Sequence, residues 1–523
     1  MFRNYECFLA HHNPSEWIFK ILHFYFEHFK ERISFYLIKL VTREKKLKKN
    51  NISLITASFP IFILVVLLSY NVFIYGDDAL SGSNQFILLI GGAVAAIIGF
   101  KNKIEYEFMI QKVAENLKSV TGALLILLFV GALAGTWLIS GIIPAMIYYG
   151  LQILHPNIFL PACIIICAII SLATGSSWTT SATVGIALIG IGTVLQIPTG
   201  MVAGAVISGA YFGDKLSPLS DTTNLAPAMA GGELFTHIRY MTYTTVPSII
   251  ITLIVFFVFS LTYEATGTAD TESLMTAINE KFSINFWLFL VPLTVIILIV
   301  KKTPPIVALL IGTLLGGLFA LIFQPEILLE INNSEHLTTA SAYRAIMDAI
   351  SVSIEISTSN ILLNDLFTSG GMEGMLGTIW LIICAMVFGG IMDAIGALTR
   401  ISDALLSWAE NTFQLFASTV ASCLAINLTA SDQYLSIVIP GKMFAKAYDD
   451  RGLAPENLSR TLEDSGTVTS VLIPWNTCGA YQSGVLGVSV GEYFIYAIFN
   501  WISPFITIFY AAFRIKISKK NKI

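Results

Sequence analysis

The sequence predicts an all-α membrane protein, a polytopic bundle of about 10–13 transmembrane helices. Of 523 residues, 55% are hydrophobic and only 12% are charged, and the mean hydropathy is +0.74. This charged share is about half that of a soluble domain, which excludes a soluble fold and a disordered chain. No Asp, Glu, Lys or Arg occurs from Ser119 to Gly213, and shorter charge-free runs recur along the chain. Runs of about 20 apolar residues indicate membrane-crossing helices, whereas barrel strands would be shorter and alternate.

Net charge and cysteine spacing exclude further classes. The formal net charge is −4, so the lipid bilayer is the expected partner and no nucleic acid is expected. The six cysteines include no CxxC pair, and Cys163 and Cys167 share one helix face, where we expect them to pack between helices. We therefore expect no disulfide framework, no resident metal and no cofactor.

The charges of the loops divide the chain and orient it. Basic residues that flank membrane spans stay in the cytoplasm, so the basic beginning and end of the chain predict two cytoplasmic termini and an even number of crossings. Within the first segment, Trp17–Phe29 is amphipathic and is expected at the inner membrane face. The expected divisions are a basic N-terminal segment (1–50), a first transmembrane half (51–262), an external loop (263–283), a second transmembrane half (284–513) with a polar external insertion (325–375), and a basic tail (514–523).

Two polar stretches interrupt the apolar runs at corresponding places. The first contains Thr174, Gly175 and Ser176, and the second contains Thr429 and Ser431. Exposed backbone at such breaks cannot face lipid, so each predicts a broken helix or a re-entrant hairpin that lines a cavity. Further polar motifs recur in the same order in the two halves, and the predicted orientations of the two halves are opposite. We therefore expect two inverted repeats, which are common in secondary transporters.

The densest polar motif in the apolar region runs from Gly209 to Pro227. Pro218 and Pro227 disrupt helical hydrogen bonds and free backbone carbonyl groups. Hard cations such as Na⁺ prefer the carboxylate, hydroxyl and carbonyl oxygens that this motif supplies. The alternative is a cytoplasmic loop in which a polar side chain caps a helix. The oxygen-bearing candidates are Asp214, Ser217, Ser220, Asp221, Thr222, Thr223 and Asn224.

The motif GAYFGDKLSPLSDTTNLAPAMAG closely resembles the signature of the NhaC family of sodium/proton antiporters, within the broader ion-transporter superfamily. Residues 54–513 also follow the hydropathy plan of that family. The resemblance implies an antiporter of the bacterial cytoplasmic membrane that exchanges internal Na⁺, with Li⁺ as a further candidate, for external H⁺. Some similar proteins exchange organic acids such as malate and lactate, so an organic-acid antiporter coupled to H⁺ or Na⁺ stays open.

Further acids lie outside this motif in apolar surroundings. A carboxylate at the centre of a membrane helix costs about 2.5–3.5 kcal/mol on insertion scales, so such residues usually have a function. Asp393 corresponds to an acidic position in a glycine-rich helix of the family, while Asp432 lies at the second interruption. Glu463 and Asp464 precede a further polar stretch that contains Pro474 and Asn476. The alternative for these acids is a place near the membrane surface, paired with Arg400 or Lys442.

The acids suggest a mechanism of competition. Burial favours a protonated carboxyl group, so H⁺ and Na⁺ compete for the same oxygens, and an empty charged site resists rearrangement. Na⁺ is expected to bind transiently at Asp221 and Asn224, and Lys215 is expected to neutralise Asp214 or to occupy the emptied site. A homodimer is a candidate assembly. The expected ion- or proton-binding residues are Asp214, Ser220, Asp221, Thr222, Thr223, Asn224, Asp393, Asp432, Asp464 and Asn476, and the expected residues of the broken helices are Thr174, Gly175, Ser176, Pro218, Thr429, Ser431 and Pro474.

Two more distant classes remain as alternatives. An ion channel usually has short repeated filter loops, whereas this chain has long halves with interrupted helices. An intramembrane enzyme would need a catalytic motif, and the sequence has neither a His-Glu metal motif nor a Gly-x-Ser-x-Gly nucleophile elbow. A transporter therefore fits the sequence better than either.

Overall fold

The computed structural model describes residues 52–75, 82–153, 155–262 and 271–520. The chain divides into two units, Met1–Ser53 and Leu54–Ile523, and the second contains every helix and strand of the described residues. The predicted interfacial segment Trp17–Phe29 lies outside the described residues.

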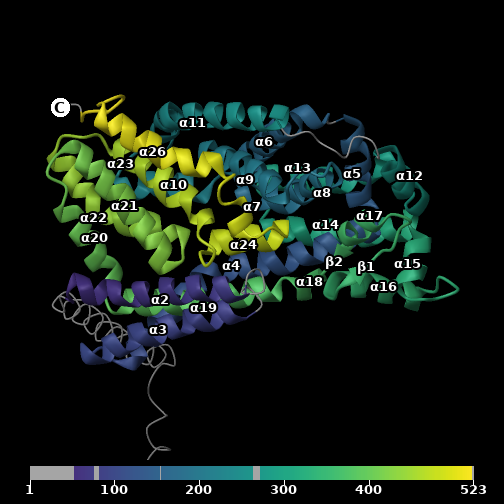
Figure 1. Ribbon diagram of the computed structural model, residues 1–523, viewed down its shortest axis with the longest axis horizontal. Helices are drawn as coiled ribbons and strands as arrows, with labels where there is room; N and C mark the ends of the chain where they lie inside the picture. The colour runs from purple at the N-terminus through teal and green to yellow at the C-terminus, as the bar shows by residue number, and fades with distance from the viewer. Residues whose placement is uncertain (1–51, 76–81, 154, 263–270, 521–523) are drawn as a thin grey trace, which may run out of the picture. The chain divides into compact units, whose positions relative to one another are not determined.

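The first half of the second unit is entirely helical where it is described (Figure 1). Several boundaries follow from local sequence: Pro156 begins α6, for example, because proline tolerates the first helical turn. Its elements are α2 (Leu54–Tyr75), α3 (Ser83–Lys101), α4 (Tyr106–Ile139), α5 (Ile142–Ile153), α6 (Pro156–Thr174), α7 (Ser177–Thr180), the π-helical turn η2 (Ser181–Gly185), α8 (Ile186–Val194), α9 (Thr199–Leu216), α10 (Asp221–Ala230) and α11 (Leu234–Thr262).

The second half adds one small hairpin to a helical array. Its helices before the hairpin region are α12 (Thr271–Lys281), the 3-10 turn η4 (Phe286–Phe289), α13 (Leu290–Val300), α14 (Pro305–Phe323), α15 (Pro325–Ile331) and α16 (Thr339–Ser351). Strands β1 (Ile354–Glu355) and β2 (Thr368–Ser369) pair antiparallel around α17 (Ile361–Leu366). The remaining elements are α18 (Gly371–Gly374), α19 (Leu376–Ala394), α20 (Ala397–Ser407), α21 (Thr412–Ala430), α22 (Gln433–Asp450), α23 (Pro455–Leu462), the π-helical turn η5 (Glu463–Thr467), the 3-10 turn η6 (Ser470–Leu472), α24 (Thr477–Leu486), α25 (Val490–Tyr493) and α26 (Ile498–Ala512).

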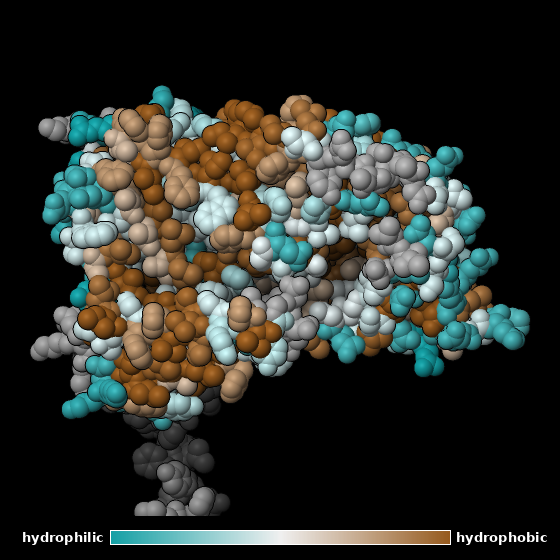
Figure 2. All heavy atoms as spheres, viewed as in Figure 1, coloured by the Kyte–Doolittle hydropathy of each residue, from teal (hydrophilic) through white to brown (hydrophobic). Residues whose placement is uncertain are grey.

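The predicted all-α membrane fold is confirmed in its main features. Nine helices of the described chain are long and apolar enough to cross a membrane, or ten if Glu272–Lys281 and Phe286–Val300, which meet at 86°, form one bent span. Large hydrophobic side chains are exposed along several of these helices, as lipid contact requires. Figure 2 shows a broad hydrophobic area on one face, with hydrophilic residues gathered at its left and right margins. The inverted relationship of the two halves stays a prediction.

The polar insertion 325–375 is folded and packs on α4. Glycines of α4 permit this contact: a Cβ atom added at Gly135 would lie 1.8 Å from the carbonyl oxygen of Ala349 in α16, and one at Gly131 would lie 2.1 Å from that of Gly371. Lys281 of α12 forms a 2.6 Å ion pair with Glu330 of α15. The insertion and the described part of the predicted external loop, residues 271–283, are therefore neighbours, as expected for segments on the same side of a membrane.

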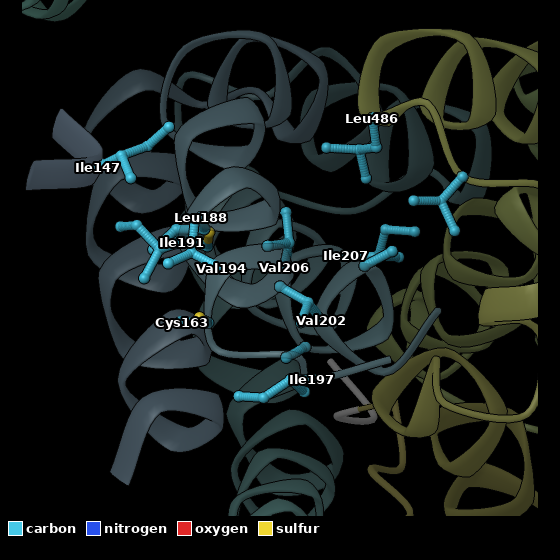
Figure 3. Packing of buried hydrophobic residues seen from close by; sticks show 14 of the residues in the cluster. Ile147, Cys163, Leu188, Ile191, Val194, Ile197, Val202, Val206, Ile207 and Leu486 are labelled. Atoms are coloured by element: carbon cyan, nitrogen blue, oxygen red, sulfur yellow. The ribbon is translucent and has the colours of Figure 1, made fainter. Parts of the chain in front are cut away.

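Helices α6 and α9 pack tightly against each other. A Cβ atom added at Gly209 or Gly213 of α9 would lie 2.3 Å from the carbonyl oxygen of Ile164 or Ala168 in α6, so only glycine fits at either position. Apolar side chains of α6, α8 and α9 fill the adjoining core, including Cys163, Leu188 and Val206 (Figure 3). This packing fixes α9, whose last turn carries Asp214 and Lys215.

Candidate functional site

The first predicted interruption is a sharp turn between two helices. Helix α6 ends at Thr174, and Gly175 takes a left-handed conformation (φ 71°) that glycine adopts without strain. The hydroxyl group of Ser176 then accepts a hydrogen bond from the backbone N–H of Thr179 (3.1 Å) and caps α7. Helix α7 leads into the π-helical turn η2, a distortion that often occurs at functional sites.

The second predicted interruption has the same local design. Helix α21 ends at Ala430, and Ser431 takes a left-handed conformation (φ 58°). Asp432 caps α22, because its Oδ1 atom accepts a hydrogen bond from the backbone N–H of Leu435 (2.8 Å). Thr429 is buried, and its hydroxyl group donates to the carbonyl oxygen of Ala425 within α21 (2.8 Å). Both interruptions are thus a left-handed residue followed by a side-chain cap.

The polar motif between α9 and α10 forms a tight connection beside the first interruption. Ser220 caps α10 by accepting from the N–H of Thr223, as the simpler interpretation of this motif expected. The hydroxyl group of Thr223 donates to the carbonyl oxygen of Lys215 (3.1 Å), which ties α10 to the end of α9. The Asn224 amide donates to the carbonyl oxygens of Pro218 (2.9 Å) and Ser220 (2.7 Å). Thr223 and Asn224 therefore hold the loop together, and neither lines the cavity that the motif borders.

The two interruptions and the motif meet around one cavity of about 660 Å³. Three carboxylates line it: Asp214 and Asp432 are buried, whereas Asp221 is exposed. Lys302 is the one basic residue among the lining residues described. The excess of negative charge favours a cation in this cavity. The other predicted site residues that line it are Thr174, Gly175, Ser176, Pro218, Ser220 and Thr222.

Asp214 and Asp432 differ in how their oxygens are bound. The Oδ2 atom of Asp214 accepts hydrogen bonds from the backbone N–H (3.1 Å) and the hydroxyl group (2.7 Å) of Ser177, at the start of α7. The Oδ2 atom of Asp432 has no hydrogen-bond partner among the described residues, although its side chain is only 1% exposed. A buried carboxylate oxygen without a donor is energetically costly, so it is available to a proton or a cation.

Lys215 does not pair with the neighbouring Asp214. Its ammonium group forms an ion pair with Oδ1 of Asp464 in η5, and both side chains are completely buried. The Oδ2 atom of Asp464 accepts from the hydroxyl groups of Thr244 in α11 (2.8 Å) and Thr507 in α26. Successive residues of a helix point about 100° apart, so Asp214 faces the cavity while Lys215 faces η5. Asp464 does not line the cavity.

Asn476 and Pro474 also lie outside the cavity lining. Asn476 caps α24, and its amide donates to the backbone carbonyl (3.1 Å) and the side-chain oxygen (3.2 Å) of Asn427 in α21. The backbone N–H of Thr477 donates to the carbonyl oxygen of Ser431 (2.9 Å). These bonds fix the start of α24 against the second interruption, and the following residues, Thr477 and Cys478, reach the cavity wall.

Asp393 lies away from the cavity, in the last turn of α19. Its carboxylate forms a 3.2 Å ion pair with Lys112 of α4, and both side chains are 29% exposed. The partner is thus Lys112 and not Arg400 or Lys442, which were the alternatives from the sequence. Lys112 belongs to the 34-residue helix α4, and its pair with Asp393 depends on the packing of α4 against α19, which no local sequence pattern indicates.

Sequence reasoning missed several residues that shape the site. Ser177 belongs to the predicted polar stretch, but its role as the donor to Asp214 depends on tertiary contact. Gln433 and Tyr434 follow Asp432 directly and also line the cavity, so the helix start signalled by Asp432 could have indicated them. Lys302 lies between α13 and α14, and no sequence pattern indicates that it reaches the cavity.

Comparison with known proteins agrees with this architecture. Residues 209–515 match the family described as the Na⁺/H⁺ antiporter family, a range that holds Asp214, Asp221, Asp432 and Asp464. The chain is 35% identical over 468 residues to the Na⁺/H⁺ antiporter NhaC of Alkalihalophilus pseudofirmus, covering 90% of this chain and 98% of that protein.

The names of two further relatives specify other solutes. The malate-2H⁺/Na⁺-lactate antiporter of Bacillus subtilis is 36% identical over 442 residues, covering 84% of this chain and 89% of that protein. The arginine/ornithine antiporter ArcD of Halobacterium salinarum is 32% identical over 457 residues, covering 86% and 90%. The relatives are transport proteins, and together with the fold they show that this multi-pass membrane chain belongs to the Na⁺/H⁺ antiporter family, as an NhaC-type member.

Proposed function

We propose that this protein exchanges cytoplasmic Na⁺ for external H⁺ across the cell membrane, and that both ions compete for the carboxylates of the central cavity. The observation that carries the proposal is the convergence of Asp214, Asp221 and Asp432 on one cavity. Asp214 and Asp221 belong to one motif and Asp432 lies in the other half of the chain, so only the folded protein brings all three together. Carboxylate, hydroxyl and carbonyl oxygens are the ligands that a hard cation prefers.

Asp432 is the group best suited to exchange one ion for the other. Its Oδ1 atom is engaged in the helix cap, while Oδ2 is buried without a donor. Either a proton or Na⁺ satisfies that oxygen, and both cannot occupy it at once. An unoccupied buried carboxylate would resist the rearrangement of the helices, because charge is costly to desolvate. Exclusive occupancy at Asp432 therefore couples the two ions.

Asp214 has a different part in the proposed site. The two donors of Ser177 stabilise its charged form, so Asp214 attracts a cation without needing a proton. Asp221 is exposed at the same cavity and supplies a further carboxylate near the entrance for ions. The negative field of the three acids raises the local Na⁺ concentration.

The charge of the cavity favours a cation over an organic acid. Malate and lactate are anions and would meet three carboxylates against the single ammonium group of Lys302. No arginine, the usual bidentate partner of a carboxylate, is among the lining residues described. The malate and lactate of the B. subtilis relative are therefore a poor fit to these side chains.

An organic cation is the second candidate. The cavity of about 660 Å³ exceeds what a bare ion fills, and aromatic Trp178 and Tyr434 form part of its wall. The Trp178 ring stacks on Tyr481 of α24 with centroids 4.0 Å apart, so this wall is fixed. Carboxylates beside aromatic rings suit the cationic groups of basic amino acids. Arginine and ornithine, which the name of the H. salinarum relative specifies, are amino acids of this kind.

Everted membrane vesicles with a pH-sensitive dye test the proposal. Na⁺, Li⁺, K⁺, malate, lactate, arginine and ornithine are added in turn to vesicles with an acidic interior. Na⁺ should release protons from vesicles that contain either the wild-type protein or Asp449→Asn. Asp449→Asn is the control, because Asp449 lies in α22, the helix that Asp432 caps, but is exposed and paired with Lys520. Asp432→Asn should abolish the response. A response to malate and lactate alone would refute the proposal that the transported solute is a cation. Normal exchange by Asp432→Asn would refute the assignment of Asp432 to the ion site.

A further inference from the structure

Glu463 is the most deeply buried acid without a hydrogen-bond partner in the described part of the chain. Its side chain is 0% exposed, and neither carboxylate oxygen has a hydrogen-bond partner among the described residues. It begins the π-helical turn η5, immediately before Asp464, and does not line the central cavity. It is therefore a separate titratable group that the proposed Na⁺ site does not use.

The nearest cations are already engaged elsewhere. Lys215 pairs with Asp464, whose second oxygen takes hydrogen bonds from Thr244 and Thr507. Arg460, one turn before Glu463 and also 0% exposed, lies over the ring of Tyr240 at 4.5 Å. Neither cation forms an ion pair with Glu463.

The charged groups around Glu463 come from few elements. Helix α9 supplies Asp214 and Lys215, and η5 itself supplies Asp464, which act on Glu463 electrostatically. Among the other elements packed against η5, α21 and α26 carry no acidic or basic residue. The remaining acidic or basic residues on these elements are Asp221 of α10, Lys442, Lys446, Asp449 and Asp450 of α22, Glu456 and Arg460 of α23, and His237 and Arg239 of α11, whose Thr244 donates to Asp464.

A charged Glu463 would be a buried carboxylate with neither an ion-pair partner nor a hydrogen-bond donor among the described residues. The Lys215–Asp464 pair is neutral as a unit, and transfer of an isolated carboxylate from water into a protein interior costs several kcal/mol even after relaxation. A protonated carboxyl group avoids that cost. We propose that Glu463 holds a transported proton, at a site separate from the Na⁺ cavity, and that this conformation keeps that proton closed off from water.

Consecutive residues of α9 connect this proton to the Na⁺ site. Asp214 lines the cavity, and Lys215 lies beside Glu463 through its pair with Asp464. The positive charge of Na⁺ bound near Asp214 favours the ionised form of Glu463 over the protonated form, because charges interact strongly in a medium of low dielectric constant. Na⁺ entry thus promotes breakage of the carboxyl O–H bond and release of the proton to water once helix movement admits water.

The inference rests on the proposed Na⁺/H⁺ exchange and is tested in proteoliposomes with Glu463→Gln. Glutamine has the size and neutrality of the protonated acid but carries no exchangeable carboxyl proton. Two quantities are measured for each protein: exchange of radioactive Na⁺ against Na⁺ at constant pH, and the number of protons moved per Na⁺, from the pH gradient that just balances a Na⁺ gradient. Glu456→Gln, the same change in α23 outside η5, is the matched control.

We expect Glu463→Gln to exchange Na⁺ against Na⁺ within about twofold of the wild-type rate, because the cavity is intact. Its proton count per Na⁺ should fall by one, while Glu456→Gln keeps the wild-type value. An unchanged proton count would show that Glu463 is only a structural neutral acid, and lost Na⁺/Na⁺ exchange would place it in the Na⁺ site; either result overturns the inference. If the wild-type protein does not carry Na⁺, the proposed function fails and the inference fails with it.

Discussion

Lys215 and Asp464 lie 249 positions apart in the sequence and form a completely buried ion pair in the folded chain. Hydroxyl groups of α11 and α26 hold the other oxygen of Asp464, so four helical segments meet at this carboxylate. The pair lies directly behind Asp214, on the side of α9 away from the cavity. The cavity wall therefore depends on an interaction between the two halves of the chain.

Removal of one partner of this pair should destabilise the protein strongly. Asp464→Asn or Lys215→Met leaves an uncompensated buried charge, which costs about 3–5 kcal/mol of unfolding free energy. Thermal unfolding in detergent measures the loss. In the control, Glu330→Gln breaks the partly exposed pair with Lys281 and should cost at most about 1 kcal/mol. Equal melting temperatures for Asp464→Asn and Glu330→Gln would contradict this account of the pair.

Substitutions at Asp432 should distinguish the role of its charge in Na⁺ binding from the role of its side chain as the cap of α22. Asparagine also caps helices, so Asp432→Asn should fold like the wild-type protein and, although it no longer exchanges ions, should bind Na⁺ about tenfold more weakly, equivalent to about 1.4 kcal/mol. Asp432→Ala should lose the same affinity and also about 1 kcal/mol of stability. Na⁺ titrations and thermal unfolding of both variants check this. A loss of stability in Asp432→Asn as large as in Asp432→Ala would show that the charge serves the cap.

Ser177→Ala should change the pH dependence of Na⁺ activation. A hydrogen bond to a charged group is worth about 1.5–3 kcal/mol, so loss of this hydroxyl group favours the protonated form of Asp214. Protons then compete better, and the Na⁺ concentration for half-maximal exchange should rise most at acidic pH. Ser181→Ala, which removes a buried hydroxyl group without a hydrogen-bond partner among the described residues, is the control. The Na⁺ concentration for half-maximal exchange is measured for both variants at several pH values. The same pH dependence in Ser177→Ala and Ser181→Ala would refute the role of Ser177.

Gly209 should tolerate no side chain. A Cβ atom there would lie 2.3 Å from the carbonyl oxygen of Ile164, so Gly209→Ala must push α9 away from α6, at a cost of about 1–3 kcal/mol. Gly377 of α19 has open space around it, and Gly377→Ala should be neutral or stabilising by up to about 1 kcal/mol. Thermal unfolding of the two alanine variants compares them directly. Equal stability would mean that α6 and α9 are not closely packed.

The sequence predicted where the chain breaks better than it predicted which side chains meet. Glycine, serine and aspartate in apolar surroundings are local signals, so the turns at Gly175 and Ser431 could be located without a structure. Asp214 and Asp432 both line the cavity that Gly175 borders, whereas the broken helices expected at the two turns stay a prediction.

The pairings could not be predicted because they depend on helix rotation and on distant segments. Adjacency suggested that Lys215 neutralises Asp214, but α9 directs the two side chains to different sides. Asp393 seemed equivalent to the other intramembrane acids, yet Lys112 reaches it from the start of a long helix. Both π-helical turns, η2 and η5, were also missed, since no residue pattern specifies an extra residue in a helical turn.

The dependence of Na⁺ binding on pH tests the central claim, exclusive occupancy, most directly. Radioactive Na⁺ binding to the purified protein is measured across a range of pH, without any ion gradient. If H⁺ and Na⁺ compete for one site, the dissociation constant for Na⁺ rises about tenfold for each unit of decreasing pH on the acidic side, while the number of Na⁺ sites stays constant. A Na⁺ dissociation constant that does not vary with pH would contradict exclusive occupancy of the cavity carboxylates.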